Sequence, residues 1–150
     1  MPAEVVVDGE TLSPEDVEAV ARAGAPVTVP EAARESVRAS RERVEEILDA
    51  GETVYGVNTG FGELVQEHID AEDIEALQQN LVRSHAAGTG DVLDVEAVRA
   101  MLVTRINALV KGYSGIRERV VDLLVGMLNE GVHPVVYTKG SLGASGDLAP

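Results

Sequence analysis

Apolar residues recur at helical spacing along most of this chain. The segment from Val95 to Lys111 carries apolar side chains on nearly every side, which is typical of a helix buried in a core. Other segments show a narrower apolar stripe between residues that favour the start and the end of a helix. The pattern predicts helices over Pro14 to Gly24, Pro30 to Ala50, Asp70 to Ala87, Val95 to Lys111 and Ser114 to Gly131.

Short β-prone runs lie between some of these helices, at residues 4–7, 27–29 and 135–137. The segment from Val54 to Gly62 holds three glycines together with Asn58 and Thr59. This composition does not support a stable helix, so it predicts a short strand that leads into a loop. The predicted fold class is mainly α, of the helical bundle type, with a few short strands.

Polar residues at helix N-termini and inside the most apolar helix refine this prediction. Ser13 and Asp94 stand where a side chain can cap a helix N-terminus. Arg105 and Asn107 fall inside the most apolar helix, where an unpaired polar group costs about 1–3 kcal/mol. We therefore expect Arg105 and Asn107 to be structural, each bonded to a loop or to a neighbouring helix.

The 150-residue chain has a formal net charge of −14, because 26 Asp and Glu outweigh 12 Lys and Arg. This negative charge repels phosphate, so nucleic acid is not an expected partner. The chain has no Cys, which excludes disulfides and any Cys-ligated metal site. The three His residues are scattered without ligand spacing, so no metal site is predicted.

The charge is uneven along the chain. Residues 1–75 hold 19 acids and 5 bases, a net of −14, whereas residues 76–150 hold 7 of each. Only two bases are Lys against ten Arg. An acid-rich, Lys-poor surface suits a salt-rich cytoplasm, but a solvated acidic face would give the same charge, and both interpretations stay open.

No apolar run approaches the roughly 18 residues that cross a bilayer, and the N-terminus lacks a basic segment followed by an apolar one. These features predict a cytoplasmic protein with no membrane partner.

The C-terminal segment is the strongest candidate for chemistry, with Gly140, Gly143 and Gly146 interleaved with Ser141 and Ser145. It lacks the Gly-Lys-Ser/Thr ending of a P-loop and the Gly-x-Gly spacing of a dinucleotide site. Its second glycine comes one residue too early for a hydrolase nucleophile elbow. By composition alone, a flexible linker is the simpler interpretation.

The triplet Ala144-Ser145-Gly146 permits a more specific chemistry. The unhindered amide nitrogen of Gly146 could attack the Ala144 carbonyl carbon if the backbone were held in a tight turn. Loss of water from that ring and from Ser145 would leave an exocyclic alkene. The result is an electrophile made without an external cofactor.

Gly143-Ala144-Ser145-Gly146-Asp147-Leu148-Ala149-Pro150 resembles the signature of the aromatic amino-acid ammonia-lyase family, whose Ala-Ser-Gly triplet cyclises to methylidene-imidazolone. The loop from Tyr55 to Gly62 is similar to the family's tyrosine loop. The runs 84–88 and 111–117 look like the histidine ammonia-lyase branch. The resemblance extends from about residue 10 to Pro150 and covers the N-terminal part of the family's sequence.

The resemblance implies roles for particular residues. Ala144, Ser145 and Gly146 would form the methylidene-imidazolone cofactor, which turns the substrate's α-amino group into a leaving group. Tyr55 matches the tyrosine that removes the β-proton. Since a phenol has a pKa near 10, the site would have to favour the phenolate through nearby positive charge or hydrogen-bond donors.

His85 lies one and two helical turns after apolar residues, so the sequence places it on a core-facing side of its helix. A lone His in that setting is more often a satisfied core residue than a site residue. The resemblance instead implies that His85 faces the substrate ring and favours histidine or tyrosine. Of these two, the flanking Ser84 and Ala86-Ala87-Gly88 favour histidine. His68 and His133 are interpreted as ordinary loop residues.

The resemblance implies elimination of ammonia from L-histidine to give urocanate, by a homotetramer with no external cofactor. The alternatives are a tyrosine or phenylalanine ammonia-lyase or aminomutase, and an inactive fragment that serves as a helical interaction module. We interpret residues 1–150 as the N-terminal active-site part of a lyase, truncated after the Ala-Ser-Gly motif. An isolated chain of this length is expected to be inactive and to fold poorly.

Overall fold

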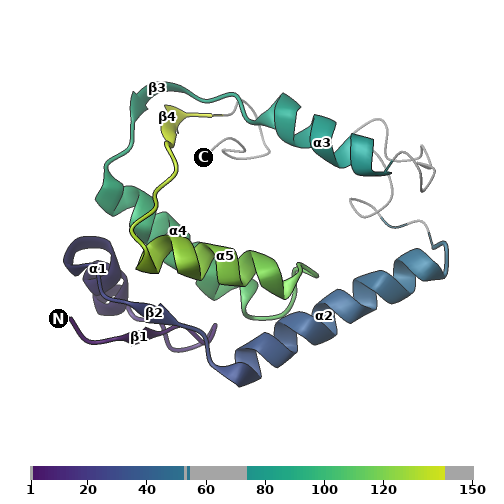
Figure 1. The fold of residues 1–150 in the computed structure, drawn as a ribbon, viewed down its shortest axis with the longest axis horizontal. Helices are drawn as coiled ribbons and strands as arrows, with labels where there is room; N and C mark the ends of the chain where they lie inside the picture. The colour runs from purple at the N-terminus through teal and green to yellow at the C-terminus, as the bar shows by residue number, and fades with distance from the viewer. Residues whose placement is uncertain (1, 53, 55–73, 141–150) are drawn as a thin grey trace. The chain divides into compact units, whose positions relative to one another are not determined.

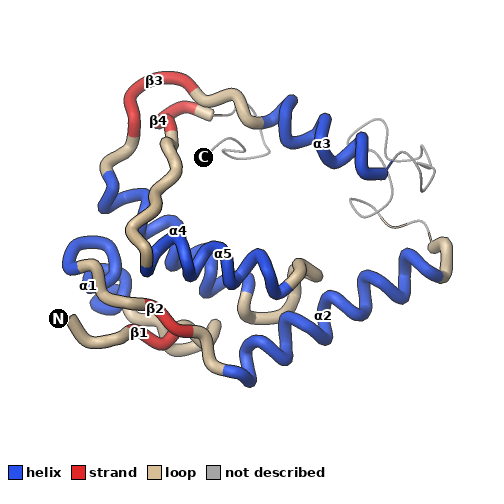
Figure 2. Tube along the Cα trace, in the orientation of Figure 1, coloured by secondary structure: helices blue, strands red, loops and turns tan. Residues whose placement is uncertain are grey.

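The computed structural model describes residues 2–52, 54 and 74–140, and its described part is mainly helical. The chain divides into two compact units, residues 1–43 with 93–135 and residues 44–92 with 136–150. Figure 1 follows the chain through both units, and Figure 2 separates helices from strands.

The first unit begins with a strand, a helix and a second strand. Strand β1 (Val5–Val6) pairs in parallel with β2 (Val27–Thr28), and α1 (Pro14–Ala23) connects them. The predicted cap of α1 is confirmed, because Ser13 and Asp16 form a reciprocal capping box. Gly24 ends α1 with a left-handed φ of 67°, a conformation that glycine adopts without strain.

Helices α4 (Val95–Leu109) and α5 (Glu118–Asn129) complete the core of this unit. The prediction that α4 is a core helix is confirmed, since Val103 and Ile106 are fully buried. Most of the core consists of valines that come from strands and helices alike. Its most buried members are Val7, Val20, Val27, Val37, Val103, Ile106, Val110, Val121 and Leu128.

Asn107 and Arg105 of α4 were both predicted to form hydrogen bonds with a loop or a neighbouring helix, and the structure agrees for only one of them. Asn107 confirms the prediction, because its Oδ1 accepts a hydrogen bond of 3.0 Å from the backbone N–H of Gly9. For Arg105 the prediction is wrong, since its side chain is exposed on the outer side of α4. Asp94 occupies the N-cap position as predicted, but its side chain makes no capping hydrogen bond.

Helix α5 begins later than predicted, at Glu118 instead of Ser114. The reason lies in the preceding loop, where Gly112 and Gly115 have φ of 77° and 62°, outside the helical region. A Cβ on Gly112 would also lie 2.7 Å from the carbonyl oxygen of Ser36, so only glycine permits this close approach. Ser40 lies on helix α2 (Glu31–Asp49), and its Oγ accepts a hydrogen bond of 3.0 Å from the N–H of Gly115, which fixes the loop on this helix.

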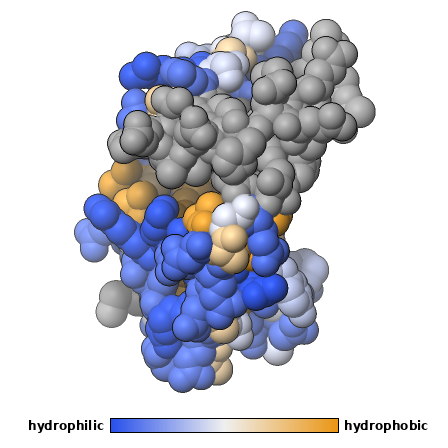
Figure 3. Space-filling view, turned by 90° about the vertical axis from the view of Figure 1, so that its right-hand side faces the viewer, coloured by the Kyte–Doolittle hydropathy of each residue, from blue (hydrophilic) through white to orange (hydrophobic). Residues whose placement is uncertain are grey.

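Helix α2 (Glu31–Asp49) carries ion pairs that bind its first turns to α5. Nη1 of Arg34 lies 3.1 Å from Glu118 Oε1, and Nη1 of Arg38 lies 3.0 Å from Glu118 Oε2. These two guanidinium groups lower the pKa of Glu118 below its ordinary value, with the hydrogen bond from Arg38 as the largest cause. Most of the remaining α2 side chains are exposed, as predicted. Among the coloured residues of Figure 3, hydrophilic ones are the most widespread.

The second unit contains α3 (Ile74–His85), which ends two residues before the predicted boundary. The predicted N-cap Asp70 and the predicted loop from Val54 to Gly62 lie outside the described residues, except for Val54 itself. Strand β3 (Thr89–Val92) was not predicted, because Gly88 and Gly90 indicated only the end of a helix. It pairs with β4 (Tyr137–Lys139), which lies two residues later than the predicted extended run.

Candidate functional site

Of the residues that the sequence predicts for the site, only His85 belongs to the described part of the structure. Tyr55, Ala144, Ser145 and Gly146 lie outside it. The candidate site is therefore defined by His85 and by the β3–β4 ladder, which connects the segment after His85 with the segment before Ala144.

His85 is the last residue of α3, and its Nδ1 lies 2.9 Å from the Oγ of Ser84. The predicted core-facing position of His85 is wrong for this chain, because its side chain is exposed. Val82, one turn earlier on α3, is 66% exposed.

The antiparallel ladder pairs Thr89 with Lys139 and Val92 with Tyr137, with an irregularity between the two pairs. Figure 1 shows β3 and β4 side by side in the second unit. Because antiparallel strands run in opposite directions, the residues before Thr89 and those after Lys139 leave the ladder from the same end. His85 lies before Thr89, and the Ala144-Ser145-Gly146 triplet follows Lys139 in sequence.

Two glycines allow β3 and β4 to approach closely. A Cβ on Gly88 would lie 2.8 Å from Cδ2 of Tyr137, and one on Gly90 would lie 2.7 Å from Oγ1 of Thr138. Gly90 also has a φ of 91°, which disfavours other residues. The glycine-rich run after His85 therefore has a packing role in addition to ending α3.

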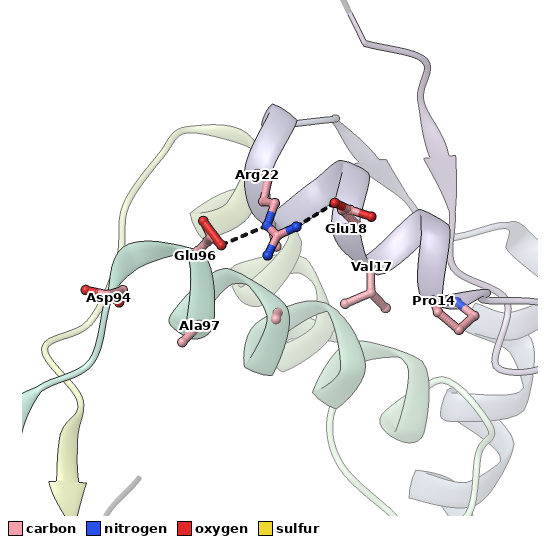
Figure 4. Close-up of a pocket in the computed structure, with 9 residues that line it drawn as sticks. Pro14, Val17, Glu18, Arg22, Asp94, Glu96 and Ala97 are labelled. Carbon is pink, nitrogen blue, oxygen red and sulfur yellow. Dashed lines mark hydrogen bonds and ion pairs between the residues drawn. The ribbon is translucent and has the colours of Figure 1, made fainter.

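A surface pocket of about 380 Å³ lies between α1 and the start of α4 in the first unit. Figure 4 shows Arg22 between two carboxylates, with Nη1 at 2.6 Å from Glu18 Oε1 and Nε at 2.8 Å from Glu96 Oε1. The hydrogen bond to Glu96, followed by that to Glu18, raises the pKa of Arg22. Since Arg22 is already paired and no predicted site residue lines the pocket, we do not assign the site there.

Within residues 2–52, 54 and 74–140, no group of three or more His, Cys, Asp or Glu side chains could hold a metal ion. No helix in this described part is long and apolar enough to cross a membrane.

Sequence reasoning missed Arg99, the one charged side chain that is buried among the described residues, at 7% exposure. Its position offered a signal, because Arg99 shares a face of α4 with Val103 and Ile106, four and seven residues later. A charged residue on the most buried face of a core helix requires strong polar partners.

The helical fold, together with the Ala-Ser-Gly segment that follows β4, defines the class of protein. Residues 12–150 match the model of the aromatic amino acid lyase family, and the chain belongs to this family. It is 68% identical over 146 residues to a probable histidine ammonia-lyase from Halobacterium salinarum, a match that covers 97% of this chain and 28% of that protein.

The solved structures that share the fold include a tyrosine aminomutase and a histidine ammonia-lyase. The tyrosine aminomutase from Streptomyces globisporus has a TM-score of 0.90 and 40% identity, over 99% of this chain and 28% of that one. The histidine ammonia-lyase from Trypanosoma cruzi has a TM-score of 0.85 and 37% identity, over 97% of this chain and 28% of that one. The chain thus spans about a quarter of the length of the relatives it matches.

Proposed function

We propose that the protein carrying this chain is a histidine ammonia-lyase, which eliminates ammonia from L-histidine to give urocanate. The observation that carries the proposal is the Gly143–Pro150 signature in a chain 68% identical to a probable histidine ammonia-lyase. The reaction breaks the Cα–N bond and one Cβ–H bond and forms a carbon–carbon double bond. No oxidant or reductant is needed.

The prosthetic group proposed for this reaction is methylidene-imidazolone, and the chain itself supplies its atoms. The amide nitrogen of Gly146 bonds to the carbonyl carbon of Ala144, and the carbonyl oxygen leaves as water. The Ser145 hydroxyl leaves with the α-hydrogen as a second water. Once formed, the group supplies an electrophile for the amino group of the substrate. The residues present fit this group, because glycine leaves the attacking nitrogen unhindered and serine provides the leaving hydroxyl.

Tyr55 and His85 have separate roles in the proposal. The Tyr55 oxygen accepts the β-proton of the substrate, as general base. The His85 ring contacts the imidazole of the substrate. The Ser84 Oγ, 2.9 Å from Nδ1 of His85, orients the His85 ring.

The β3–β4 ladder supports a shared location for these residues. Ala144 follows Lys139 by five residues, so an extended chain limits their separation to about 18 Å. His85 precedes Thr89 by four residues, which limits that separation to about 14 Å. Since Thr89 pairs with Lys139, both segments are tethered to one point of the second unit.

The proposal extends to assembly and location. We expect a homotetramer in the cytoplasm, with L-histidine as the small-molecule partner. Size-exclusion chromatography with light scattering on the full-length protein measures the oligomeric state, and cell fractionation measures the location. A monomer at working concentration would contradict the proposed assembly.

The activity is tested by incubating the full-length protein separately with L-histidine and L-tyrosine and following the absorbance of each product. Faster formation of urocanate is expected. The Ser145→Ala variant is the matched control, because it lacks the hydroxyl that leaves and should lose turnover while it keeps the fold. Equal turnover by the variant would overturn the role of the triplet.

A second candidate is a tyrosine ammonia-lyase or aminomutase, favoured by the 40% identity and TM-score of 0.90 to the tyrosine aminomutase. Preferential turnover of L-tyrosine, with formation of coumarate or β-tyrosine, would support it. The remaining alternative is a non-catalytic helical module. Intact mass separates it from both enzymes, since cyclisation removes two waters, about 36 Da by formula arithmetic.

A further inference from the structure

Arg99 lies at a junction of three helices in the first unit. Its Nε donates a hydrogen bond of 2.8 Å to the carbonyl oxygen of Val20, and its Nη1 donates one of 3.0 Å to the carbonyl oxygen of Leu128. Nη1 also lies 3.1 Å from Nε2 of His133. No carboxylate in the described part of the chain forms an ion pair with Arg99. The buried guanidinium is therefore held, among the described residues, by two backbone carbonyl groups and an imidazole nitrogen.

The two carbonyl groups explain why a cation is stable at this position. Val20 belongs to the last turn of α1, and Leu128 belongs to the last turn of α5. Carbonyl groups at a helix C-terminus lack intrahelical donors and carry the negative end of the helix dipole. Arg99 thus closes the C-terminal ends of two helices at once, from a position on α4.

The third partner is different because it can titrate. A guanidinium can only donate, so Nε2 of His133 accepts the hydrogen bond with its lone pair. This geometry requires a neutral imidazole with its proton on Nδ1. A proton on Nε2 would remove the acceptor and would place a second positive charge beside the buried Arg99.

From α4 the Arg99 guanidinium faces His133, and the helix ends that share this guanidinium contribute the carbonyl groups of Val20 and Leu128. Among the described residues, neither His133 nor Arg99 takes part in an ion pair. The contact depends on the lone pair of Nε2, so a proton on this nitrogen breaks it.

His133 also stands at a particular place in the chain. It follows the end of α5 by four residues and precedes Pro134, after which the chain runs through β4 towards Ala144-Ser145-Gly146. Val136, between His133 and β4, is buried at 9% exposure. The Arg99–His133 contact thus fixes the point from which this segment departs.

We propose that the Arg99–His133 contact is a proton-sensitive hold on the segment from α5 to β4, closed when His133 is neutral and open when it is protonated. Arg99 is a positioning residue that acts through His133. Any effect of the hold on catalysis rests on the proposed lyase function, because only that function requires the Ala144-Ser145-Gly146 segment to keep one conformation. The hold itself is independent of that function.

Hydrogen exchange of the full-length protein at about pH 8 and about pH 5, a range that spans ordinary histidine titration, tests the hold. After correction for intrinsic exchange rates, protection of residues 130–136 is expected to fall about tenfold at the lower pH, as for loss of one hydrogen bond to a charged group. Residues 100–108 of α4 serve as the internal reference. A wild-type protein in which both segments respond equally to pH overturns the proposal.

Variants separate the effect of protonating His133 from the effect of protonating the many carboxylates of this chain at low pH. His133→Gln keeps an acceptor oxygen that does not titrate, so its protection should not change between the two pH values. Arg99→Gln should open the segment at both, whereas Arg105→Gln, on the exposed side of the same helix, should behave as wild type. His133→Asn replaces His133→Gln if the longer side chain prevents folding.

The readout needs neither substrate nor prosthetic group. A full-length protein without the mass loss at residues 144–146 would refute the lyase proposal and leave the exchange result unaffected. A pH response in His133→Gln equal to that of wild type would refute the hold and leave the lyase proposal unaffected.

Discussion

Asn129, the last residue of α5, pairs with both backbone groups of Val27 in β2. Its Oδ1 accepts the Val27 N–H at 2.8 Å, and its Nδ2 donates to the Val27 carbonyl oxygen at 2.9 Å. The primary amide thus takes the place of a neighbouring strand for a residue that is completely buried. A helix end and a strand 102 positions apart in sequence are joined in this way.

Replacing Asn129 by Asp should destabilise the protein by about 1–3 kcal/mol, because the Val27 carbonyl would face a carboxylate oxygen instead of a donor. Urea unfolding of the full-length protein measures the change. Glu130→Gln, at the exposed next position, is the matched control and should stay within about 0.5 kcal/mol of wild type. An Asn129→Asp protein as stable as wild type would show that the paired hydrogen bonds contribute nothing.

Gly88→Ala should disturb the β3–β4 ladder, because the added Cβ would lie 2.8 Å from the ring of Tyr137. Either the ring or the strand must move, so we expect faster hydrogen exchange in β3 and β4 and reduced turnover. Gly126→Ala, where the added Cβ meets nothing within 4 Å, is the control. The Gly88→Ala, Tyr137→Ala double variant should recover part of the exchange protection; no recovery would contradict the proposed clash.

The ion pairs of Glu118 with Arg34 and Arg38 should make α2–α5 packing sensitive to acid. The folded protein lowers the Glu118 pKa below its ordinary value of 4.5. The stabilisation is therefore fully present above about pH 4.5 and is lost as the pH falls through the lowered value. Glu118→Gln should flatten the dependence of stability on pH in this acid range, measured by thermal unfolding. A profile that keeps the wild-type slope below pH 4.5 would contradict this assignment.

His85→Leu should reduce turnover of L-histidine far more than it reduces stability, because the His85 side chain is exposed in this chain. Parallel measurement of kcat/KM and of the unfolding midpoint separates the two effects. Ser84→Ala should give a smaller loss of the same kind, since it removes only the hydroxyl next to Nδ1. Equal losses of stability and activity in His85→Leu would show that His85 is a core residue of the full-length protein.

Stability of the protein should rise with KCl concentration, because residues 1–75 carry a net charge of −14 and repel one another at low salt. Unfolding followed from about 0.1 M to about 3 M KCl measures the effect. Stability that is flat or falls over this range would favour the alternative, an ordinary solvated acidic face.

The sequence predicted the helices well where local signals were strong. Ser13 and Pro14 gave the start of α1, and the almost uniformly apolar α4 was predicted to lie in the core. Prediction failed where a glycine can either end a helix or allow two strands to approach closely. Gly88 and Gly90 indicated the end of a helix, but in the structure they also allow a strand to pass close to Tyr137 and Thr138.

The candidate site shows the same division. The Ala144-Ser145-Gly146 triplet was predicted from residue type and order, and Tyr55 was predicted from the family resemblance. Their roles, and that of His85 towards substrate, remain predictions. Arg99 was missed, since its partners are backbone carbonyl groups of two other helices and a histidine that follows one of them.

The sequence by itself determined the family, the helical fold class and the atoms of the proposed prosthetic group, because local propensity and a contiguous motif are properties of neighbouring residues. Only the tertiary structure decided which side chains bond to which backbone groups. The amide of Asn129 hydrogen-bonds to Val27, that of Asn107 accepts from Gly9, and Arg99 donates to the carbonyl groups at two helix ends. Each of these contacts joins positions far apart in sequence, and no pattern of neighbouring residues specifies which backbone group will lie about 3 Å from a given side chain.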